Sequence, residues 1–529
     1  MTSAVLPSLP PPSLFRPLFS RLALGAALLA APALFAGENE SAVRPTALRL
    51  TAESAIQAAL AKNFSIEVQR FEPRIARENV TSALGRFDPV FDLSVKRDET
   101  SQRNAFASGG QIDPVTGLEI TPFSAGVRLP VRRVNRLDNF SAGLRGGTPL
   151  GVSYDLGLGS RNNLGVFNGF TDDLATTASL GLTVPLLRGA GPAANLAQVR
   201  IARNNVLVSE WALKSRVIDI ITTTTFVYNE LHLAHENLRV AERSRELARQ
   251  LFNDNQARVN IGVMSPLDVT QARAEVAARE EGVILAQRTV LDNENLLKQL
   301  VTNDIERLLD VRVEIAPPPS PAFRADVPAG LREALALRPD YRQSILDIER
   351  RNITLAFTKN AVLPRFDLTG SLSLLGFEND FGSSFNHVGS RDQTAWTVGA
   401  IVSITIPNRD ARGAANAAKL ECAKALVALQ ELEQKIVVDV DNASGQIITS
   451  RQRIVSTTES SRLAQESLDA GEQRLKAGTG TTFVVLELQK KLIEAEAAQL
   501  RARADYNKAV SEYQRQTGTA LREHGVALK

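Results

Sequence analysis

Asp88-Pro89-Val90-Phe91-Asp92-Leu93 is the stretch that decides the fold, because a related segment, Leu363-Pro364-Arg365-Phe366-Asp367-Leu368, returns far along the chain. Upstream of it, Ala59-Leu60-Ala61 returns as Ala334-Leu335-Ala336 at the same offset of 275 (364 − 89 and 334 − 59). A duplication of this length sets the architecture before any local prediction. We expect two similar halves that pack as parts of one object.

A second pair of related segments marks two turns between long helices. Arg258-Val259-Asn260-Ile261-Gly262 returns as Arg474-Leu475-Lys476-Ala477-Gly478, at an offset of 216 (474 − 258). The residues from Ala193 to Asn260 include neither proline nor glycine. A helix of that length would extend for roughly 100 Å, which a compact globular domain cannot hold.

The helices that follow each turn have a heptad seam. Apolar side chains recur with steps of 3 and 4, which is typical of a coiled coil. The seam comprises Val485, Leu488, Leu492, Ala495, Gln499, Ala502, Tyr506, Ala509 and Tyr513 and, at the equivalent positions of the earlier helix, Val269, Ala272, Val276, Arg279, Val283, Ala286, Val290, Asn293 and Leu297. A plain antiparallel coiled-coil protein explains these helices equally well, but it does not explain strands placed between helices.

Those strands are predicted from alternation with a period of two. Phe91, Leu93 and Val95 fall on one side of the chain, with polar residues between them, as in a strand with one apolar face. Residues 97–137 have little periodicity and predict a long exposed loop, and 139–160 predict an extra hairpin. Each half has only a few strands, and one chain has too few to close a hollow barrel, so several chains would have to contribute strands to one barrel with a polar, water-filled lumen.

Composition excludes several functional classes. The formal net charge is +3, from 61 basic and 58 acidic residues, which argues against a general nucleic-acid-binding surface. Cys422 is the single cysteine, so no internal disulfide or cysteine metal site is expected. His232 and His235 have no third ligand nearby, and no nucleophile–base pair, phosphate loop or cofactor fingerprint is present. We expect no enzyme, no cofactor and no metal site.

The N-terminal residues predict a cleaved secretory signal. Arg16 and Arg21 precede an apolar run at 22–31, and small residues follow at Ala33 and Ala36. This run is shorter than the roughly 20 residues that a spanning helix needs.

The predicted organisation is therefore a signal peptide followed by two repeats of one plan. The signal peptide is 1–36, and a proline-rich linker at 316–329 joins the two repeats. The first repeat, 37–315, has a helix at 48–86, strands within 88–185 and a helical hairpin at 193–301 whose tip is 261–266. The second repeat, 330–529, has a helix at 330–360, strands within 364–407, a helical hairpin at 411–516 whose tip is 477–482, and a C-terminal tail.

At this point the chain resembles the TolC-like outer-membrane efflux protein family, the outer membrane factors of tripartite efflux and type I secretion systems. Each motif is weak alone, and their order, spacing and duplication are specific. The motifs are the segment from Leu50 to Leu60, Phe87-Asp88-Pro89, Val184-Pro185-Leu186-Leu187-Arg188-Gly189, the two turn segments, and Asp268-Val269.

The resemblance implies an α+β membrane protein with a two-fold internal repeat. Three chains would form an outer-membrane β-barrel, with four strands from each chain, continued by a long periplasmic α-helical coiled-coil barrel. A periplasmic adaptor and an inner-membrane pump or ABC transporter would be the partners. The extra hairpin at 139–160 departs from this plan and leaves the strand count open.

The resemblance also implies roles for residues at the two tips. The adaptor would dock at Ile261, Gly262 and Val263 and at Ala477, Gly478 and Thr479. Asp268 and Glu487 would face the pore as rings of carboxylates that bind cations. Arg258 and Arg474 are equivalent in the two repeats, and from that equivalence, not from the resemblance, we expect them to pair with carboxylates of neighbouring helices and hold the tip shut. Val484 stands where a second acidic residue is usual. The alternative for each charged residue is a solvated helix face.

The predicted function is that of the exit duct of a tripartite efflux system for small molecules in the outer membrane of a Gram-negative-type envelope. A type I protein-secretion duct has the same fold. An alternative of another class is a soluble periplasmic coiled-coil scaffold. The sequence does not indicate the cargo.

Overall fold

The computed structural model describes residues 47–104, 111–112, 119–120, 131–167, 170–304, 312–319 and 322–526. These residues belong to one compact unit, Thr46–Lys529. The predicted signal peptide at 1–36 lies outside the described residues. All statements below concern the described part of this unit.

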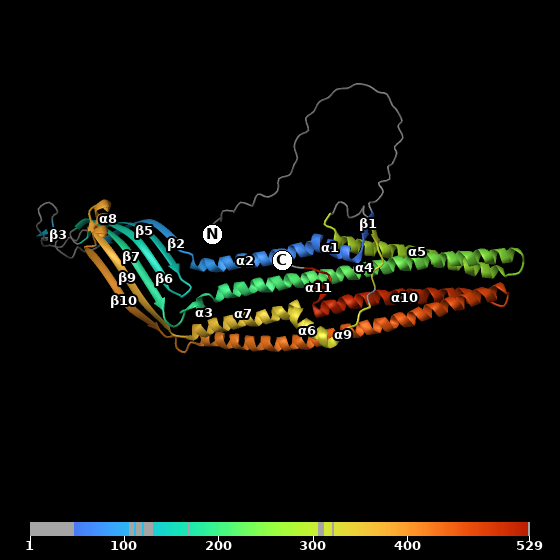
Figure 1. The fold of residues 1–529 in the computed structure, drawn as a ribbon. Helices are drawn as coiled ribbons and strands as arrows, with labels where there is room; N and C mark the ends of the chain where they lie inside the picture. The colour runs from blue at the N-terminus through green and yellow to red at the C-terminus, as the bar shows by residue number, and fades with distance from the viewer. Residues whose placement is uncertain are drawn as a thin grey trace, which may run out of the picture. The chain divides into compact units, whose positions relative to one another are not determined.

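A six-stranded antiparallel sheet forms one end of the unit (Figure 1). Its strand order is β10-β9-β7-β6-β5-β2, so β2 and β10 are the two edges. The strands are β2 (Val90–Asn104), β5 (Val131–Gly147), β6 (Ser153–Phe167), β7 (Phe170–Pro185), β9 (Arg365–Glu378) and β10 (Gln393–Ser403). Two-residue strands β3 (Gln111–Ile112) and β4 (Glu119–Ile120) pair with each other.

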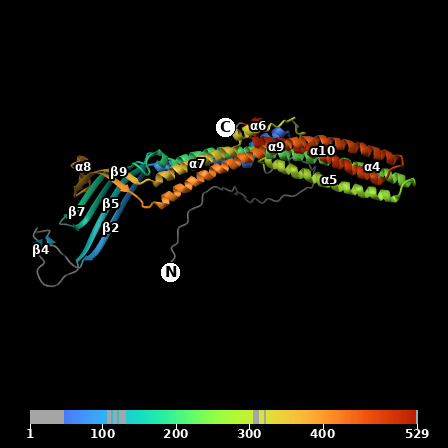
Figure 2. The same cartoon turned by 90° about the horizontal axis from the view of Figure 1, so that it is seen from below.

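Two long helical hairpins extend away from the sheet. The first is α4 (Ala197–Asn260) with α5 (Pro266–Val301), and the second is α9 (Arg409–Lys476) with α10 (Thr482–Thr517). The hairpins contact each other through α4 and α10. Both views show their turns side by side at the end farthest from the sheet (Figure 1 and Figure 2).

Shorter elements flank the long helices. Helices α1 (Ala52–Lys62) and α2 (Phe64–Leu84) pack on α4, and α7 (Pro339–Val362) packs on both α9 and α4. The remaining elements are β1 (Ala47–Leu50), which pairs in parallel with β8 (Arg312–Ile315), η1 (Gly85–Phe87), α3 (Pro192–Asn195), α6 (Val327–Leu337), α8 (Phe381–Ser390) and α11 (Ala520–Glu523).

The seam residues form much of the core. Val485, Leu492, Ala502, Tyr506, Ala509 and Tyr513 are buried, as are Ala272, Val283, Val290 and Leu297. The heptad pattern thus indicated which faces of α5 and α10 pack inside the chain. In the part of the chain that the structure describes, no helix is both long enough and apolar enough to cross a membrane.

The prediction of a single helix at 48–86 is wrong, because the helix is interrupted at Asn63, between α1 and α2. The backbone of Asn63 is extended, and its side chain accepts a hydrogen bond from the Ser65 amide at 2.9 Å. Its amide nitrogen also donates to the Leu300 carbonyl of α5 at 3.3 Å. An asparagine that caps one helix and ties it to another favours a break over a continuous helix.

The predicted helix at 330–360 also divides, into α6 and α7. Arg338 is extended between them, because a residue before proline is disfavoured in the helical region, and Pro339 begins α7. Helix α6 begins at Val327, inside the predicted linker at 316–329.

The predicted loop at 97–137 is shorter than expected. Strand β2 continues to Asn104 and β5 begins at Val131. Register places Arg97 opposite Asp138 and Glu99 opposite Arg136, and both pairs form ion pairs, at 2.6 and 3.0 Å. In the second half, the polar segment between β9 and β10 contains helix α8, which packs over β7 and β9.

Candidate functional site

The two hairpin tips have the same backbone geometry. Helix α4 ends in a Schellman motif, in which the Val263 amide donates to the Arg258 carbonyl at 3.0 Å and the Gly262 amide to the Val259 carbonyl at 3.0 Å. Helix α9 ends the same way, with the Thr479 amide on the Arg474 carbonyl at 3.0 Å and the Gly478 amide on the Leu475 carbonyl at 3.2 Å.

Glycine is required at both turns by the backbone angle. Gly262 has φ +81° and Gly478 has φ +76°, a left-handed conformation in which a side chain on Cβ is strained. Apart from its chain neighbours, an added Cβ would meet no atom of the described residues within 4 Å at either position. Glycine is therefore needed at both positions for the left-handed backbone conformation of the turn, and not because a neighbouring atom leaves no room for a side chain.

Arg258 connects the two tips. Its Nη1 donates to the Leu475 carbonyl of α9 at 2.9 Å, so a cation stands at the negative end of the α9 dipole. The predicted pairing of Arg258 with a carboxylate does not occur between described residues of the single chain. Arg474 is exposed, and within the described ranges it has no ion pair. The equivalent arginines of the two hairpins therefore have different surroundings.

The structure reveals tip residues that the sequence reasoning missed. Asn255 of α4 is fully buried, and its Nδ2 donates to Oγ1 of the buried Thr482 of α10 at 3.3 Å. Its Oδ1 is buried without a partner in the described structure. The same part of the two hairpins contains a cluster of buried apolar side chains, Leu251, Leu468, Leu475, Val485 and Leu492. The one available signal was position, since Asn255 lies one helical turn before Arg258.

The two predicted gate acids lie at the starts of the returning helices. Asp268 is half-buried in the first turn of α5, where the Ser265 side chain caps the helix by accepting from the Leu267 amide at 3.2 Å. Glu487 is exposed, in the second turn of α10. They belong to different hairpins, and neither makes an ion pair with another described residue. A carboxylate in the first turn of a helix is stabilised by the helix dipole.

Several exposed side chains at the tips are apolar. Ile261 is 74% exposed, Val263 69% and Leu267 64%. On the second tip, Phe483 and Val484 are exposed as well. Exposed apolar residues gathered at one place are typical of a protein interaction surface. Of the six docking positions predicted, all are exposed.

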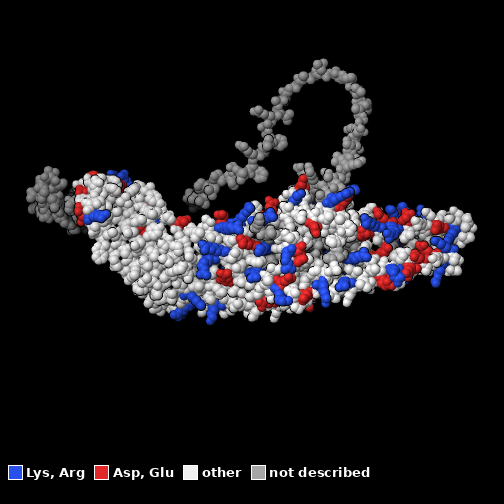
Figure 3. Space-filling view, in the orientation of Figure 1, with Lys and Arg blue, Asp and Glu red and all other residues white. Residues whose placement is uncertain are grey.

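The opposite end of the unit has a different surface. Few charged side chains lie over the middle of the sheet on the face in view, whereas charges of both signs cover the helices (Figure 3). Exposed apolar side chains occur on most of the strands: Phe91, Leu93 and Val95 on β2, Leu156 on β6, Leu180 and Leu182 on β7, Leu368 and Leu372 on β9, and Trp396, Val398 and Val402 on β10.

Each of two helices next to the sheet has two apolar faces, one buried within the chain and one exposed. In α2, Ile66, Pro73 and Ala76 are buried within the chain, while the opposite side of the helix has an exposed stripe. This α2 stripe is Phe64, Val68, Phe71 and Ile75, all at least half exposed. In α9, Ile436 and Val440 are buried, and Leu420, Val427 and Val438 form an exposed α9 stripe on the other side. A helix that is apolar on both faces normally packs on both.

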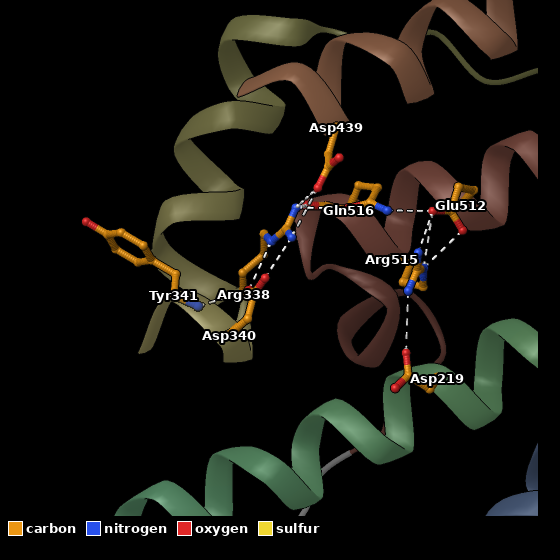
Figure 4. A network of polar contacts seen from close by, with 8 residues as sticks. All are labelled: Asp219, Arg338, Asp340, Tyr341, Asp439, Glu512, Arg515 and Gln516. Atoms are coloured by element: carbon orange, nitrogen blue, oxygen red, sulfur yellow. Dashed lines mark hydrogen bonds and ion pairs between the residues drawn. The ribbon is translucent and has the colours of Figure 1, made fainter. Parts of the chain in front are cut away.

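A polar junction holds the middle of the unit together (Figure 4). The Arg338 side chain is only 9% exposed and contacts Asp340 at 2.7 Å, Asp439 at 3.4 Å and Oε1 of Gln516 at 2.9 Å. Arg515 of α10 pairs with Glu512 at 2.8 Å and reaches Asp219 of α4 at 3.6 Å. The junction therefore links α7, α9, α10 and α4.

The arginines of the junction determine the pKa values of its carboxyls. Burial acts to raise the pKa of Asp340, but hydrogen bonds and charge from Arg338 outweigh it, and the pKa lies below its ordinary value. For Glu512, burial again raises the pKa, and the hydrogen bonds from Arg515 and Gln516 outweigh it, so that this pKa is lowered too. Both groups are therefore ionised at neutral pH.

The two histidines on α4 have no metal-binding companions. Burial lowers the pKa of His232 and of His235, although Glu236 and Glu294 respectively act in the opposite direction. Across the described ranges there is no group of three or more histidine, cysteine, aspartate or glutamate side chains that could hold a metal ion.

Comparison with known proteins identifies the family. The model of the outer membrane efflux protein family matches residues 149–303 and 330–519. The chain belongs to this family. The TolC-like resemblance is confirmed by this match, and membership places the chain among outer membrane efflux proteins.

Individual relatives are distant. The chain is 26% identical over 270 residues to the pyoverdine export outer membrane protein OpmQ of Pseudomonas putida, over 50% of this chain and 54% of that protein. It is 22% identical over 299 residues to the toluene efflux pump outer membrane protein TtgC of Pseudomonas putida, over 56% of this chain and 60% of that one. The chain thus spans between half and two thirds of the length of these curated relatives.

Solved structures share the fold. The Campylobacter jejuni outer membrane channel CmeC superposes with a TM-score of 0.65 at 16% identity, covering 89% of this chain and 86% of that one. The Vibrio cholerae outer membrane protein VceC superposes with a TM-score of 0.61 at 14% identity, covering 88% and 96%. This chain therefore shares its overall fold with these proteins.

Proposed function

We propose that this chain is the outer-membrane exit duct of a tripartite export system, a trimer in which solutes leave the periplasm without chemical transformation. In this proposal the sheets of three chains close one outer-membrane β-barrel. The hairpins of the two repeats, two from each chain, form a periplasmic α-helical coiled-coil barrel. Membership of the outer membrane efflux protein family supports it.

The observation that carries the proposal is that each of the two sides of the chain has an edge strand of the sheet next to a helix with an exposed apolar stripe. On one edge, the α2 stripe is followed by the edge strand β2; on the other, the edge strand β10 is followed by the α9 stripe. Val68 and Ile75 stand 16 and 9 before Leu84, the sheet-proximal end of α2 (84 − 68 and 84 − 75). Leu420 and Val427 stand 11 and 18 after Arg409, the sheet-proximal end of α9 (420 − 409 and 427 − 409).

The two stripes therefore stand at similar distances from the sheet, so that one copy's α2 stripe can pack on the next copy's α9 stripe while β2 pairs with β10. Such a head-to-tail interface generates a closed ring when the rotation closes. It also removes the unpaired backbone of both edge strands, which hydrocarbon does not tolerate. The ring size of three rests on the family resemblance.

The hairpin tips form the proposed gate. A three-fold axis turns Asp268 and Glu487 each into a ring of three carboxylates, which attracts cations. The bond from Arg258 to the Leu475 carbonyl keeps the two tips of one chain together, and Arg474, exposed and without an ion pair in the described chain, is available to a neighbouring chain. Opening then requires few and individually weak contacts to change.

The exposed tip is the proposed docking surface of a periplasmic adaptor. Ile261 and Val263 beside Gly262, with Ala477 and Thr479 beside Gly478, present a small apolar and hydroxyl surface on rigid Schellman turns. The adaptor would connect the duct to an inner-membrane pump. The relatives are named for the export of pyoverdine and of toluene, and small molecules are the cargo class that we propose.

Recording from planar bilayers tests the duct. The purified protein should insert and conduct with a small, cation-selective conductance when the tips are closed, and divalent cations should block it from the tip side. If the assembled protein neither inserts nor conducts, the duct is excluded and a periplasmic scaffold remains.

The gate has a separate test. Asp268→Asn combined with Glu487→Gln should weaken the block by divalent cations by about tenfold or more, since both rings lose their charge. Asp254→Asn, an exposed acid on α4 near the same tip, is the matched control and should leave the block unchanged. An unchanged block in the double variant would remove both acids from the gate.

A further inference from the structure

The β5–β6 hairpin lies in the middle of the sheet and not at its margin. Strand order places β5 and β6 between β2 and β7. The family resemblance implies four strands from each chain, and the main sheet of the described chain has six. The question is whether the additional hairpin is part of the barrel wall or a separate structure that folds over the wall or into the lumen.

The hairpin is paired along its length on both sides. Strand β5 pairs with β2 from Arg145 opposite Val90 to Val131 opposite Asn104, and β6 pairs with β7 from Ser153 opposite Thr183 to Asn163 opposite Asp173. A tight turn joins β5 to β6, with the Thr148 amide on the Val152 carbonyl at 2.8 Å. A plug or lid would leave these strand edges unpaired.

The two faces of the sheet continue through the hairpin without interruption. One row of directly opposed residues, one from each strand, is entirely apolar: Phe91, Leu144, Leu156, Leu180, Leu372 and Trp396. The adjacent row, on the other face, is small or polar: Asp92, Gly143, Gly157, Ser179, Ser373 and Ala395. Because side chains alternate between faces, β5 and β6 meet the same two environments as their neighbours.

Glycines fit the hairpin to its surroundings. An added Cβ at Gly181 of β7 would lie 2.3 Å from Oδ1 of Asp155 on β6. An added Cβ at Gly146 of β5 would lie 2.5 Å from the Tyr154 hydroxyl on β6. In each case the neighbouring strand's side chain occupies the space that a larger residue would need, so β5, β6 and β7 are packed as one continuous surface.

We infer that all six strands of each chain form the wall of the barrel, so that the proposed trimer has eighteen strands (three times six) and not twelve. This inference rests on the proposed function. The diameter of a barrel increases roughly in proportion to its strand number, so the lumen at the sheet end is about one and a half times as wide as that of a twelve-stranded barrel. Selection by size then takes place at the helical tips, and the outer end admits larger solutes.

Site-specific labels distinguish wall from plug. In a Cys422→Ser background, single cysteines replace Leu144 on the apolar face of β5 and Ser141 on its polar face. Leu180→Cys and Ser179→Cys on β7 are the matched controls. Each variant is labelled with a fluorescent maleimide in lipid vesicles and quenched by brominated lipid or by aqueous iodide.

If β5 and β6 are part of the barrel wall, brominated lipid should quench the Leu144→Cys label as strongly as the Leu180→Cys label, and iodide should quench the Ser141→Cys and Ser179→Cys labels. If lipid quenches the label on β7 and not that on β5, the hairpin is outside the wall and the inference is wrong. If lipid quenches neither, the sheet is not in a membrane, and the proposed function fails together with the inference.

Excision of the hairpin gives a second, independent measurement. Removing residues 131–167 leaves β2 and β7 in antiparallel order, as in a four-stranded sheet. The largest polyethylene glycol that enters the channel from the sheet side should then become smaller, while exclusion from the tip side stays the same. An unchanged cut-off on the sheet side would show that the hairpin does not widen the lumen.

Discussion

At the scale of single residues, the tips depend on two glycines in the same conformation. Gly262 and Gly478 are both left-handed, and apart from the chain neighbours no atom of the described residues lies within 4 Å of an added Cβ. The repeated turn segment predicted both turns, because a glycine at the end of a long helical pattern is a strong local signal. It did not predict the partner of Arg258, since that bond depends on the packing of one hairpin against the other.

Replacing either glycine should loosen its own tip. We expect Gly262→Ala or Gly478→Ala to destabilise the turn by about 1 kcal/mol, because alanine is strained at positive φ. Hydrogen exchange of amides 259–264 or 475–480 should rise by about fivefold. Gly282→Ala, in the exposed middle of α5, is the control and should slow exchange locally, since alanine favours a helix. Equal effects at all three positions would contradict the role of the turn geometry.

The two arginines should differ although their sequence surroundings are alike. Arg258→Met removes the donor to the Leu475 carbonyl, which we expect to cost about 1.5–3 kcal/mol locally, the range for hydrogen bonds to charged groups. Exchange should increase at the α9 C-terminus and the open probability of the channel should rise. Arg474→Met, which removes no ion pair in the described chain, should leave exchange within one chain unchanged. If both variants behave alike, Arg258 does not connect the tips.

At the scale of elements, the parts predicted well are those whose pattern is local. The heptad seam identified the buried faces of α5 and α10 because each helix repeats its own burial pattern. The part of β2 after Lys96 was not predicted, because the residues around Arg97 and Glu99 do not alternate between polar and apolar side chains. Those residues are satisfied by Asp138 and Arg136 on β5, and complementarity between strands is invisible until the register is known. The break at Asn63 likewise depends on the Leu300 carbonyl of α5, 237 residues away.

The α2 stripe gives a prediction about assembly. Val68→Glu or Phe71→Glu places a charge on a surface that would pack against the next copy's α9, so we expect monomers in place of the trimer. Each side chain is exposed in the single chain, so its helical circular dichroism should not change. Sedimentation in detergent measures the state of association. Val68→Leu, which keeps the stripe apolar, should still assemble; a trimer that survives both glutamate variants would show that α2 lies outside the interface.

At the scale of the whole molecule, the polar junction and the histidines of α4 control stability in two separate ranges of pH. The carboxyls of Asp340 and Glu512 have lowered pKa values in the folded chain. Their contribution is complete above the unfolded pKa, near 4, and is lost as pH falls through the lower folded values. Arg338→Met should remove the part of that acid-dependent contribution that comes from Asp340 and leave Asp340 and Asp439 without their shared cation, while Arg515 and Gln516 still lower the pKa of Glu512.

The histidines act at higher pH. Because burial lowers the folded pKa of His232 and His235, the unfolded chain binds protons first as pH falls below about 6.5. Stability should therefore be constant above pH 7 and fall as the pH decreases below about 6.5, before the carboxyls titrate. Thermal melts of the helical signal should show a declining midpoint over that range. A variant with His232→Gln and His235→Gln should have a shallower decline, and the same acid transition below pH 4.5.

The two ranges separate the causes within one set of melts. If the double histidine variant keeps the full decline between pH 6.5 and pH 5, these residues are not responsible, and His524, whose pKa is also lowered by burial, becomes the remaining candidate. Arg338→Met supplies the complementary result: its melting midpoint should be lower at neutral pH, its decline between pH 6.5 and pH 5 should match that of the original chain, and its loss of stability below pH 4.5 should be smaller. A single variant that altered both ranges equally would show that the junction and the histidines of α4 are coupled through the packing of α4 on α10.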